Sequence, residues 1–544
     1  MKILGLAGAL GHDASACLIV GDVVVAMAEE ERFSRQRHAH EATPVASARY
    51  CLDAGGLALS EIDAVALGWD PCLAPYPVLK TFTTDWLGRM GAGRRSPPII
   101  PVPHHLSHAA SAFVSSGFDE AAILVVDGQG EDTSTSIGYG QGGRLRLDRT
   151  WPIGDSLGHL YRSVTRAIGF PPFAEGKVMG LSAYPSDGVF DFPIEFTAEG
   201  YRLAFEDGPP AAELLELERV IFRWLEARNL LLCNVADPDA GADGLRAIHE
   251  NAAAVRLAAS LQRSVERAVL HLAALAVRQA GVRRLVLAGG LALNCVANGR
   301  LLADGIVDEL YVPPVANDAG TSLGAAQVVA LEHGYRPRLD SVFLGPQTEN
   351  AAIEAALLRA GASFRTCEDP AAAAAELLTQ NKLLGWFQGS AEVGPRALGR
   401  RSTVALAGGG TAQRDRVNRA KGRELWRPLA PAISGAKAAQ LFEPAALSPC
   451  MTLSGRATER GAEQLSAAVH IDGTSRAQVV AADDGPWSRL IVQVERHCGA
   501  PGVINTSLNS AGAPIVNTPE DALEAFRSSQ LHALIIENYI IERP

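Results

Sequence analysis

Runs of apolar residues divide the chain into short strands and amphipathic helices. Three strands are predicted near the start, at 2–8, 14–20 and 23–29, followed later by 61–69, 121–127 and 284–288. Positions with helical periodicity predict helices at 43–58, 157–170 and 250–279. A Gly-Asp pair at 21–22 is typical of a tight hairpin. Hairpins thus alternate twice with strand–helix units, which predicts an α/β fold with two related lobes.

A Pro- and Gly-marked stretch near residue 340 indicates a domain boundary. It is followed by predicted helices at 350–361 and 370–381 and a strand at 383–390. We therefore expect domains at 1–340 and 341–544. Three stretches show no clear periodicity. The charged stretch 29–40 is expected to start a solvated helix or lid, and 70–100 is expected to be a loop region. The stretch 185–245 is expected to be an insertion near an acceptor pocket.

The 544-residue chain carries a net charge of −11, which argues against broad contact with nucleic acid. Its eight cysteines contain no CxxC pair, as expected in a reducing cytoplasm. The apolar start of the chain is interrupted by His12 and Asp13, so we expect no signal peptide. No uncharged stretch approaches the ~20 apolar residues that cross a membrane. These features predict a cytoplasmic globular enzyme; a homodimer is a base-rate expectation.

Two histidines and two aspartates have the spacing of metal ligands. His104 and His108 are four residues apart, so on a helix they share one face. Asp127 ends a predicted buried strand, and Asp318 lies in a loop before a predicted helix. Imidazole and carboxylate ligands together suit a divalent transition metal. His105 does not fit this spacing, and we expect it to be structural.

Glycine-rich turns provide candidate phosphate loops at 8–15 and 128–140. A Gly-Lys pair that includes Lys177 is either a further phosphate contact or an exposed helix start. Each stretch also admits a purely structural interpretation when taken alone.

Positive charge collects in the second predicted domain. Residues 391–427 contain nine Lys or Arg against three Asp or Glu, a net of +6 in an acidic chain. Gly and Pro interrupt this stretch, which favours a shaped pocket over a solvated charged face. Arginine forks and lysine charges match phosphate oxygens. We therefore expect a polyphosphate or acyl-phosphate pocket rather than a structural ion-pair network.

Ten motifs in one order give the chain a specific resemblance. They are GHDASACL, HHLSHA, VVDGQGE, GKVMGL, LAGGLALN, NDAGTSLGAA, GPRALGRRS, KGRELWRPLAPA, HIDGTSR and NTSLN. In this order they resemble the NodU/CmcH carbamoyltransferases, a family that includes O-carbamoyltransferases of antibiotic biosynthesis, such as the one acting on tobramycin. The resemblance extends from about residue 3 to 530 and is weakest over 185–245.

The resemblance implies an N-terminal domain with the actin-like ATPase fold, similar to the threonylcarbamoyl-transfer protein of tRNA modification. It implies a C-terminal YrdC-like domain that forms carbamoyl-adenylate from carbamoyl phosphate and ATP, with Mg²⁺. The first domain would then transfer the carbamoyl group to a hydroxyl of a small-molecule natural product. Because carbamoyl-adenylate hydrolyses readily, we also expect an internal tunnel between the two sites.

By family position, four residues are the implied ligands of Fe(II) or another divalent metal: His104, His108, Asp127 and Asp318. The implied catalytic residues are His12, a base for the acceptor hydroxyl, with Lys421 and Arg476. The implied nucleotide and carbamoyl phosphate contacts are Lys177, Gly289, Gly290, Asn294, Arg396, Arg423, Met451, Asn505, Ser507 and Asn509.

Three other functions compete with this one. A tRNA-modifying carbamoyl-adenylate enzyme would use the same chemistry, but the net acidic charge argues against it. A non-catalytic ATP-binding module would leave the cation-rich stretch and the His/Asp set unexplained. A sugar kinase would give the second domain no task. The identity of the acceptor is not encoded in any motif that we find.

Overall fold

The computed structural model describes residues 1–8, 11–73, 77–91, 96–205, 214–232, 244–443 and 448–543. Contacts within the chain divide it into two compact units. Unit 1 is Met1–Glu30 with Glu41–Asp340, and unit 2 is Glu31–His40 with Ser341–Pro544. The short segment 31–40 therefore belongs with the C-terminal part of the chain.

Unit 1 contains two five-stranded sheets with the same topology. The first has the order β3-β2-β1-β4-β5, with β1 (Lys2–Ala7), β2 (Ser15–Val20), β3 (Val23–Glu29), β4 (Ala64–Leu67) and β5 (Ile99–Pro101). The second has the order β8-β7-β6-β11-β12, with β6 (Glu120–Val126), β7 (Thr133–Gln141), β8 (Arg144–Pro152), β11 (Arg284–Ala288) and β12 (Glu309–Tyr311). In each, three antiparallel strands are extended by two parallel ones. The prediction of two related α/β lobes is confirmed.

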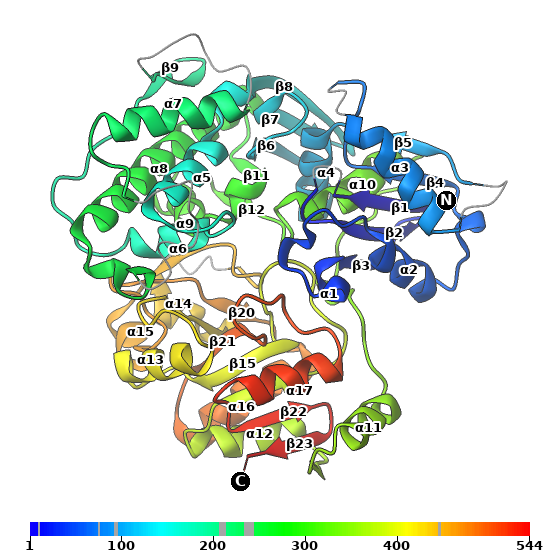
Figure 1. The fold of residues 1–544 in the computed structure, drawn as a ribbon, viewed down its shortest axis with the longest axis vertical. Helices are drawn as coiled ribbons and strands as arrows, with labels where there is room; N and C mark the ends of the chain where they lie inside the picture. The colour runs from blue at the N-terminus through cyan, green and yellow to red at the C-terminus, as the bar shows by residue number, and fades with distance from the viewer. Residues whose placement is uncertain are drawn as a thin grey trace. The chain divides into compact units, whose positions relative to one another are not determined.

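Two helices pack against each other between these sheets. α10 (Thr321–Glu332) lies on β1, β2 and β4, and α4 (His104–Ser116) lies on β6 and β11 (Figure 1). Gly324 permits their close contact, because a Cβ there would lie 1.7 Å from the carbonyl oxygen of Ser107. Of the predicted metal ligands, His104 and His108 lie on α4, Asp318 lies in the short 3-10 turn just before α10, and Asp127 directly follows β6.

Other helices of unit 1 surround the sheets. They are α2 (Val45–Ala54), α3 (Pro77–Arg89), α5 (Leu157–Ile168), α6 (Glu175–Leu181), α7 (Leu214–Glu226), α8 (Ala252–Ala280) and α9 (Cys295–Ala303). The prediction of a loop region over 70–100 is wrong for α3, where Phe82 and Trp86 are buried four residues apart. The predicted insertion 185–245 contains α7 and the hairpin β9 (Ile194–Thr197) and β10 (Gly200–Leu203). Parts of these two stretches, at 74–76, 92–95, 206–213 and 233–243, lie outside the described residues.

Unit 2 is built on a mixed eight-stranded sheet with the order β13-β23-β22-β14-β15-β21-β16-β20. Its strands are β13 (Arg365–Thr366), β14 (Leu384–Phe387), β15 (Arg401–Leu406), β16 (Ala430–Ser434), β20 (Gln478–Val480), β21 (Gly502–Ser507), β22 (Ala533–Ile536) and β23 (Tyr539–Glu542). Leu384 and Trp386 pack in one apolar cluster, and Phe387 packs in a second. Side chains alternate across a strand, so this sheet has an apolar core on each face.

Helices cover both faces of the unit 2 sheet. α12 (Pro370–Thr379) and α16 (Gly485–Cys498) contribute to one core, and α11 (Asn350–Arg359), α13 (Gly410–Ala420) and α17 (Pro519–Ser528) contribute to the other. Within the described ranges of both units, no helix is long and apolar enough to span a membrane.

The segment 31–40 is anchored in unit 2 by two arginines. It begins with the short helix α1 (Glu31–Ser34). Arg32 is only 2% exposed and donates to the carbonyl of Gly394 at 2.6 Å. Arg35 donates to the carbonyl of Ile515 at 2.8 Å and pairs with Asp521 at 3.3 Å. The predicted helix start is confirmed by α1, but the expectation of a solvated segment is wrong at Arg32 and Arg35, whose guanidinium groups bind carbonyl and carboxylate oxygens.

Candidate active site

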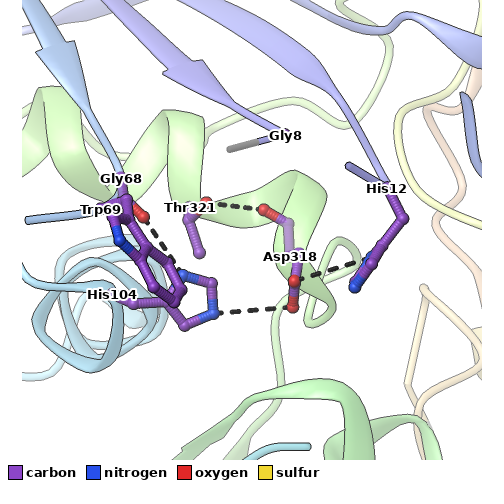
Figure 2. A pocket seen from close by; sticks show the side chains of 7 residues that line it. All are labelled: Gly8, His12, Gly68, Trp69, His104, Asp318 and Thr321. Carbon is purple, nitrogen blue, oxygen red and sulfur yellow. Dashed lines mark hydrogen bonds and ion pairs between the residues drawn. The ribbon is translucent and has the colours of Figure 1, made fainter. Parts of the chain in front are cut away.

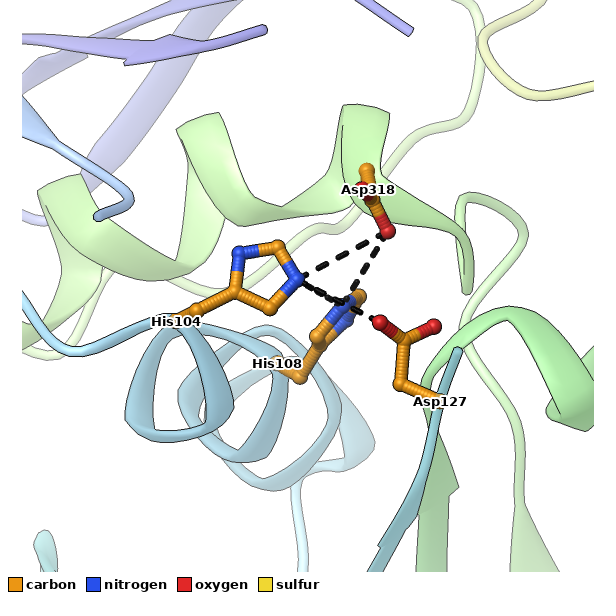
Figure 3. A group of neighbouring side chains, drawn as sticks. All are labelled: His104, His108, Asp127 and Asp318. Carbon is orange, nitrogen blue, oxygen red and sulfur yellow. Dashed lines mark hydrogen bonds and ion pairs between the residues drawn. The ribbon is translucent and has the colours of Figure 1, made fainter. Parts of the chain in front are cut away.

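Two histidines and two aspartates converge at the centre of unit 1 (Figure 3). The candidate ligand atoms of His104, His108, Asp127 and Asp318 all lie within 4.8 Å of one another, and all four residues are buried. The Nε2 atoms of the two histidines are 3.1 Å apart. His104 Nε2 lies 3.5 Å from Asp127 Oδ2 and 3.6 Å from Asp318 Oδ1. The structure thus brings together the four residues predicted as metal ligands.

Backbone groups orient these side chains. Nδ1 of His104 lies 3.1 Å from the carbonyl oxygen of Gly68, to which it donates in the tautomer that leaves a lone pair on Nε2. The N–H of Gly290 donates to Asp127 Oδ1 at 2.6 Å, so Oδ2 faces the cluster. Each contact fixes which atom of the ligand is turned toward the other three residues.

The charges of the cluster hold it together in the ligand-free chain. Burial of the His104 ring opposes its protonation, but the carboxylates of Asp318 and Asp127 outweigh this and raise the pKa of His104 well above its ordinary value. Burial likewise raises the pKa of both carboxyls, and the histidines overcome it: the pKa of Asp127 falls to about 2, and that of Asp318 falls well below its ordinary value. Both aspartates are therefore ionised and ready to bind a cation.

The arrangement fits a divalent metal ion. Ligand atoms about 2.0–2.2 Å from one ion are separated from each other by roughly 3–3.6 Å. The separations of His104 Nε2 from His108 Nε2, Asp127 Oδ2 and Asp318 Oδ1 are 3.1, 3.5 and 3.6 Å. Two neutral imidazoles and two carboxylates also form a donor set that a transition metal accepts. The cluster therefore has the spacing, burial and charge of a metal site.

His12 lies at the edge of this cluster (Figure 2). Its Nδ1 is 3.7 Å from Asp318 Oδ2 and 3.4 Å from Asp13 Oδ2. A small pocket here is lined by Gly8, His12, Gly68, Trp69, His104, Asp318 and Thr321. Burial lowers the pKa of His12, but the hydrogen bond to Asp13 and the charge of Asp318 raise it more, so the net pKa is above the ordinary value. Without a cation in the cluster, His12 is therefore easier to protonate than an ordinary histidine, whereas a base requires the neutral ring.

The residues predicted to border adenosine have structural partners in this form. Gly289 has a φ of +92°, and a Cβ there would lie 2.3 Å from the carbonyl oxygen of Val126. Asn294 caps α9 through the N–H of Ala297 and pairs with the side-chain amide of Gln262. These contacts explain why glycine and asparagine occur here, and the contact with adenosine stays a prediction.

Lys177 on α6 and His105 on α4 are the two remaining residues of unit 1 for which the sequence predicted a role. The ammonium of Lys177 on α6 is 5.5 Å from the centre of the Phe170 ring, and its predicted phosphate contact stays a prediction. His105 Nδ1 lies 2.8 Å from Ser136 Oγ, and burial lowers the pKa of His105 to about 3. His105 is therefore neutral and held away from the ligand set, in agreement with a structural role.

Glu131 is a buried carboxylate that joins two parts of the site and was not among the predicted site residues. Its oxygens accept the N–H of His104 at 2.9 and 3.2 Å and the N–H of Asp70 at 2.8 Å. Glu131 therefore caps the helix that carries both histidines and fixes the loop that supplies the Gly68 carbonyl. Its only signal in the sequence is its place in the motif VVDGQGE, four residues after Asp127.

Replacing Glu131 with Ala should weaken divalent metal binding by about 10–100-fold, as is typical when an outer partner of a metal ligand is lost. Glu131→Gln keeps one acceptor oxygen and should recover most of the affinity. Metal titration of the full chain measures both effects. Equal metal affinity in the Ala variant and the wild type would show that the ligands hold their positions without this cap.

Unit 2 contains a cluster of cations with little compensation. Lys421 is 7% exposed; its Nζ donates to the carbonyl of Ser507 and to Asn509 Oδ1. Arg423 donates to Thr506 Oγ1 at 3.0 Å. Arg427 reaches only Glu424, at 3.4 Å. The predicted phosphate residues Lys421 and Arg423 thus lie together against the end of β21.

Mutual repulsion marks this cluster electrostatically. Burial and the charges of Arg423 and Arg427 lower the pKa of Lys421 well below its ordinary value. Burial and the charge of Arg427 also lower the pKa of Arg423 well below its ordinary value. Glu424 opposes this shift, and Arg476 and Arg37 add smaller repulsion. A bound polyanion would relieve this repulsion, whereas an ordinary structural ion pair would not produce it.

The remaining predicted residues of unit 2 differ in how they are placed. Asn505 is buried and donates to the carbonyl of Ala397 at 3.0 Å and to Gln478 Oε1 at 2.8 Å. Ser507 donates to Asn509 Oδ1 at 2.8 Å, next to Lys421. Met451 is buried against Leu398 and Ala430 with a φ of +57°. Arg396 is partly buried in the loop between β14 and β15. Their predicted ligand contacts stay predictions.

Two cations of this cluster were not among the predicted site residues. Arg427 lies in the basic stretch 391–427, but no specific role was predicted for it. Arg37 lies in the segment 31–40, far from Arg423 and Arg427 in the sequence. The charge of Arg37 acts on both Arg423 and Arg427. Only the tertiary fold places a residue from the N-terminal sequence in this pocket, so no local motif could have shown it.

Comparison with known proteins identifies the family of this chain. The family described as Carbamoyltransferase N-terminus matches residues 75–327, and Carbamoyltransferase C-terminus matches 375–543. Nodulation protein NolNO of Sinorhizobium fredii is 33% identical over 599 residues, covering 100% of this chain and 83% of that protein. Nodulation protein NolO of Bradyrhizobium diazoefficiens is 33% identical, covering 81% of this chain and 78% of that protein.

Among solved structures, HypF of T. kodakarensis is similar, with a TM-score of 0.36 and 15% identity over 62% of this chain. This chain spans about half of HypF, 48% of its length. Two family matches together cover most of the sequence, and NolNO is similar over the whole of this chain. The chain therefore belongs to the carbamoyltransferase family of the nodulation proteins and is a carbamoyl-transferring enzyme.

Proposed function

We propose that this enzyme is an ATP-dependent O-carbamoyltransferase that works in two half-reactions. Unit 2, as a YrdC-like domain, makes carbamoyl-adenylate from carbamoyl phosphate and ATP. Unit 1, as an actin-like domain, transfers the carbamoyl group to a hydroxyl of a small-molecule acceptor and releases AMP. The observation that carries this proposal is the buried, mutually repelling cation cluster of unit 2, which calls for a polyanionic substrate.

The first half-reaction joins two anions, so its barrier is largely electrostatic. In balanced form, carbamoyl phosphate and water give carbamate and phosphate; a carbamate oxygen then attacks the α-phosphorus of ATP, and pyrophosphate leaves. Lys421, Arg423 and Arg476 would offset the charges of these phosphates. Asn505, Ser507 and Asn509 would orient the carbamoyl or phosphate oxygens by hydrogen bonds.

The second half-reaction needs an electrophilic carbonyl and a base. His104, His108, Asp127 and Asp318 would hold a divalent metal, with Fe(II) as the family expectation, which when bound acts as a Lewis acid toward the adenylate. A cation in the cluster would offset the charge of Asp318 and so lower the pKa of His12. The neutral imidazole could then take the proton of the acceptor hydroxyl as the carbamoyl carbon–oxygen bond to AMP breaks.

Pyrophosphate release without an acceptor tests the first half-reaction. The wild type should release pyrophosphate and phosphate in equal amounts only when ATP and carbamoyl phosphate are both present. Arg476→Ala should lower the release by at least about 100-fold, because it removes one charge aimed at the phosphates. Release from ATP alone at the same rate would contradict the proposal. Tight ATP binding with no release under any divalent metal would favour a non-catalytic module instead.

A further inference from the structure

Arg162 on α5 is a cation near the metal cluster, and none of the carboxylates that the structure describes pairs with it. Its guanidinium carbon lies 4.6 Å from the centre of the Phe173 ring, and that ring makes an edge contact with His12 at 5.2 Å. The charge of Arg162 acts on His12. In the described part of the chain, no Asp or Glu lies within 4.0 Å of its guanidinium, whereas Arg166, one turn further along the helix, pairs with Glu218.

His159 lies one turn before Arg162, on the same face of α5. It is 4% exposed, and its Nε2 has no hydrogen-bond partner among the described residues. The ring packs on the backbone at Gly128, where a Cβ would lie 3.6 Å from it. The charges of Asp127, Arg162 and His12 all act on His159, which places it at the rim of the cluster. A buried nitrogen without a partner costs free energy unless a ligand satisfies it.

The start of α5 is joined to the loop that carries Asp127. Ser156 donates to the carbonyl of Gly128 at 2.7 Å and accepts the N–H of His159 at 3.0 Å. Asp127 itself is fixed by Gly290. Arg162 and His159 are therefore held at a set position relative to the metal ligands rather than on a free surface helix.

We propose that Arg162 and His159 bind the phosphate of the adenylate, and of the AMP that leaves, in unit 1. This inference rests on the proposed function, because it assigns a ligand to the transfer site. A guanidinium near the ionised Asp127 and Asp318 adds positive charge where the phosphate of the adenylate approaches the metal ligands. A guanidinium offers paired N–H donors that match phosphate oxygens, and neutral His159 adds one more donor in its Nε2–H tautomer.

AMP and adenosine titrations of the full chain test this assignment. The background is Arg476→Ala, which weakens phosphate binding in unit 2, with Mn²⁺ present. Adding Arg162→Gln should weaken AMP binding by about 10–100-fold, the loss expected for charge-assisted hydrogen bonds, and leave adenosine affinity within about twofold. The AMP affinity of Arg162→Lys should fall between that of the parent protein and that of Arg162→Gln. Adenosine lacks the phosphate, so loss of a phosphate contact should weaken AMP binding alone. A misfolded variant would lose affinity for both AMP and adenosine.

Arg166→Gln is the matched control, since it removes an equal charge from the same helix, where Arg166 pairs with Glu218 and lies over the Phe222 ring. It should leave AMP affinity unchanged. AMP affinity that is the same with Gln and Arg at 162, or no AMP binding in the parent protein, would overturn the inference. Arg162→Gln in the otherwise native chain should still release pyrophosphate from ATP and carbamoyl phosphate. Absence of this release in the wild type would contradict the proposed function and not the assignment of Arg162.

Discussion

Asp127→Asn is expected to lose the bound divalent metal and to lower carbamoyl transfer by at least about 100-fold. The asparagine oxygen can still accept the N–H of Gly290, so the loop should keep its shape. What disappears is the negative charge at Oδ2, 3.5 Å from His104 Nε2. Because that carboxylate also supports protonation of His104, the variant should lower the pKa of this histidine in the metal-free chain. Metal analysis after dialysis and transfer to a test acceptor measure the two losses.

Asp132→Asn is the control for this variant. Asp132 lies in the same loop but is exposed, and its carboxylate accepts a hydrogen bond from the hydroxyl of Thr133 at 2.9 Å. It should keep full metal content and full transfer. Both variants should release pyrophosphate from ATP and carbamoyl phosphate at the rate of the wild type, because the cation cluster of unit 2 is unchanged. Full metal content in Asp127→Asn would mean that the other three residues suffice, and that Asp127 is not a ligand.

The metal cluster could be predicted from the sequence because each ligand has a local signal. His104 and His108 have helical spacing, and Asp127 ends an apolar strand. Their orienting partners have no such signal. The carbonyl of Gly68 and the carboxylate of Glu131 reach His104 from loops 36 and 27 residues away. Only the packing of the two sheets with α4 and α10 brings these groups together.

In helix α3 the sequence contains a helical pattern of apolar residues, but neighbouring Pro and Gly residues led to the prediction of a loop. Phe82 and Trp86 have the spacing of one helix face, yet Pro and Gly residues around them favoured a loop. The segment 31–40 shows the opposite case. Its dense charge is typical of a solvated surface, but Arg32 and Arg35 find carbonyl and carboxylate oxygens in unit 2. Composition alone does not distinguish a solvated charge from one that is buried with partners.

Lys421→Met should stop pyrophosphate release and, at the same time, make the ligand-free protein more stable. Loss of one cation at the phosphates should lower release by at least about 100-fold. The buried ammonium is repelled by Arg423 and Arg427, so a neutral side chain of similar length should raise the free energy of unfolding by about 1–2 kcal/mol. No acceptor is left without a donor, because Thr403 also donates to the Ser507 carbonyl and Ser507 Oγ donates to Asn509 Oδ1. Denaturant unfolding without ligands measures the gain.

The pH dependence of this stability separates charge from packing. The folded-state pKa of Lys421 is lowered, so between that pKa and the ordinary value of about 10.4 the unfolded chain binds more protons than the folded one. Stability from this group therefore rises with pH in the wild type and is lost as pH falls through the folded pKa. Lys421→Met should lack this component, so its gain in the free energy of unfolding over the wild type should shrink as pH rises.

Lys437→Met is the control, because it removes a lysine that is paired with Glu495 at 2.8 Å on the surface of unit 2. It should change neither pyrophosphate release nor the slope of stability against pH. A Lys421→Met protein that is less stable than the wild type at neutral pH would show that the ammonium stabilises the empty pocket, and the case for a polyanion site built from repelling cations would fail.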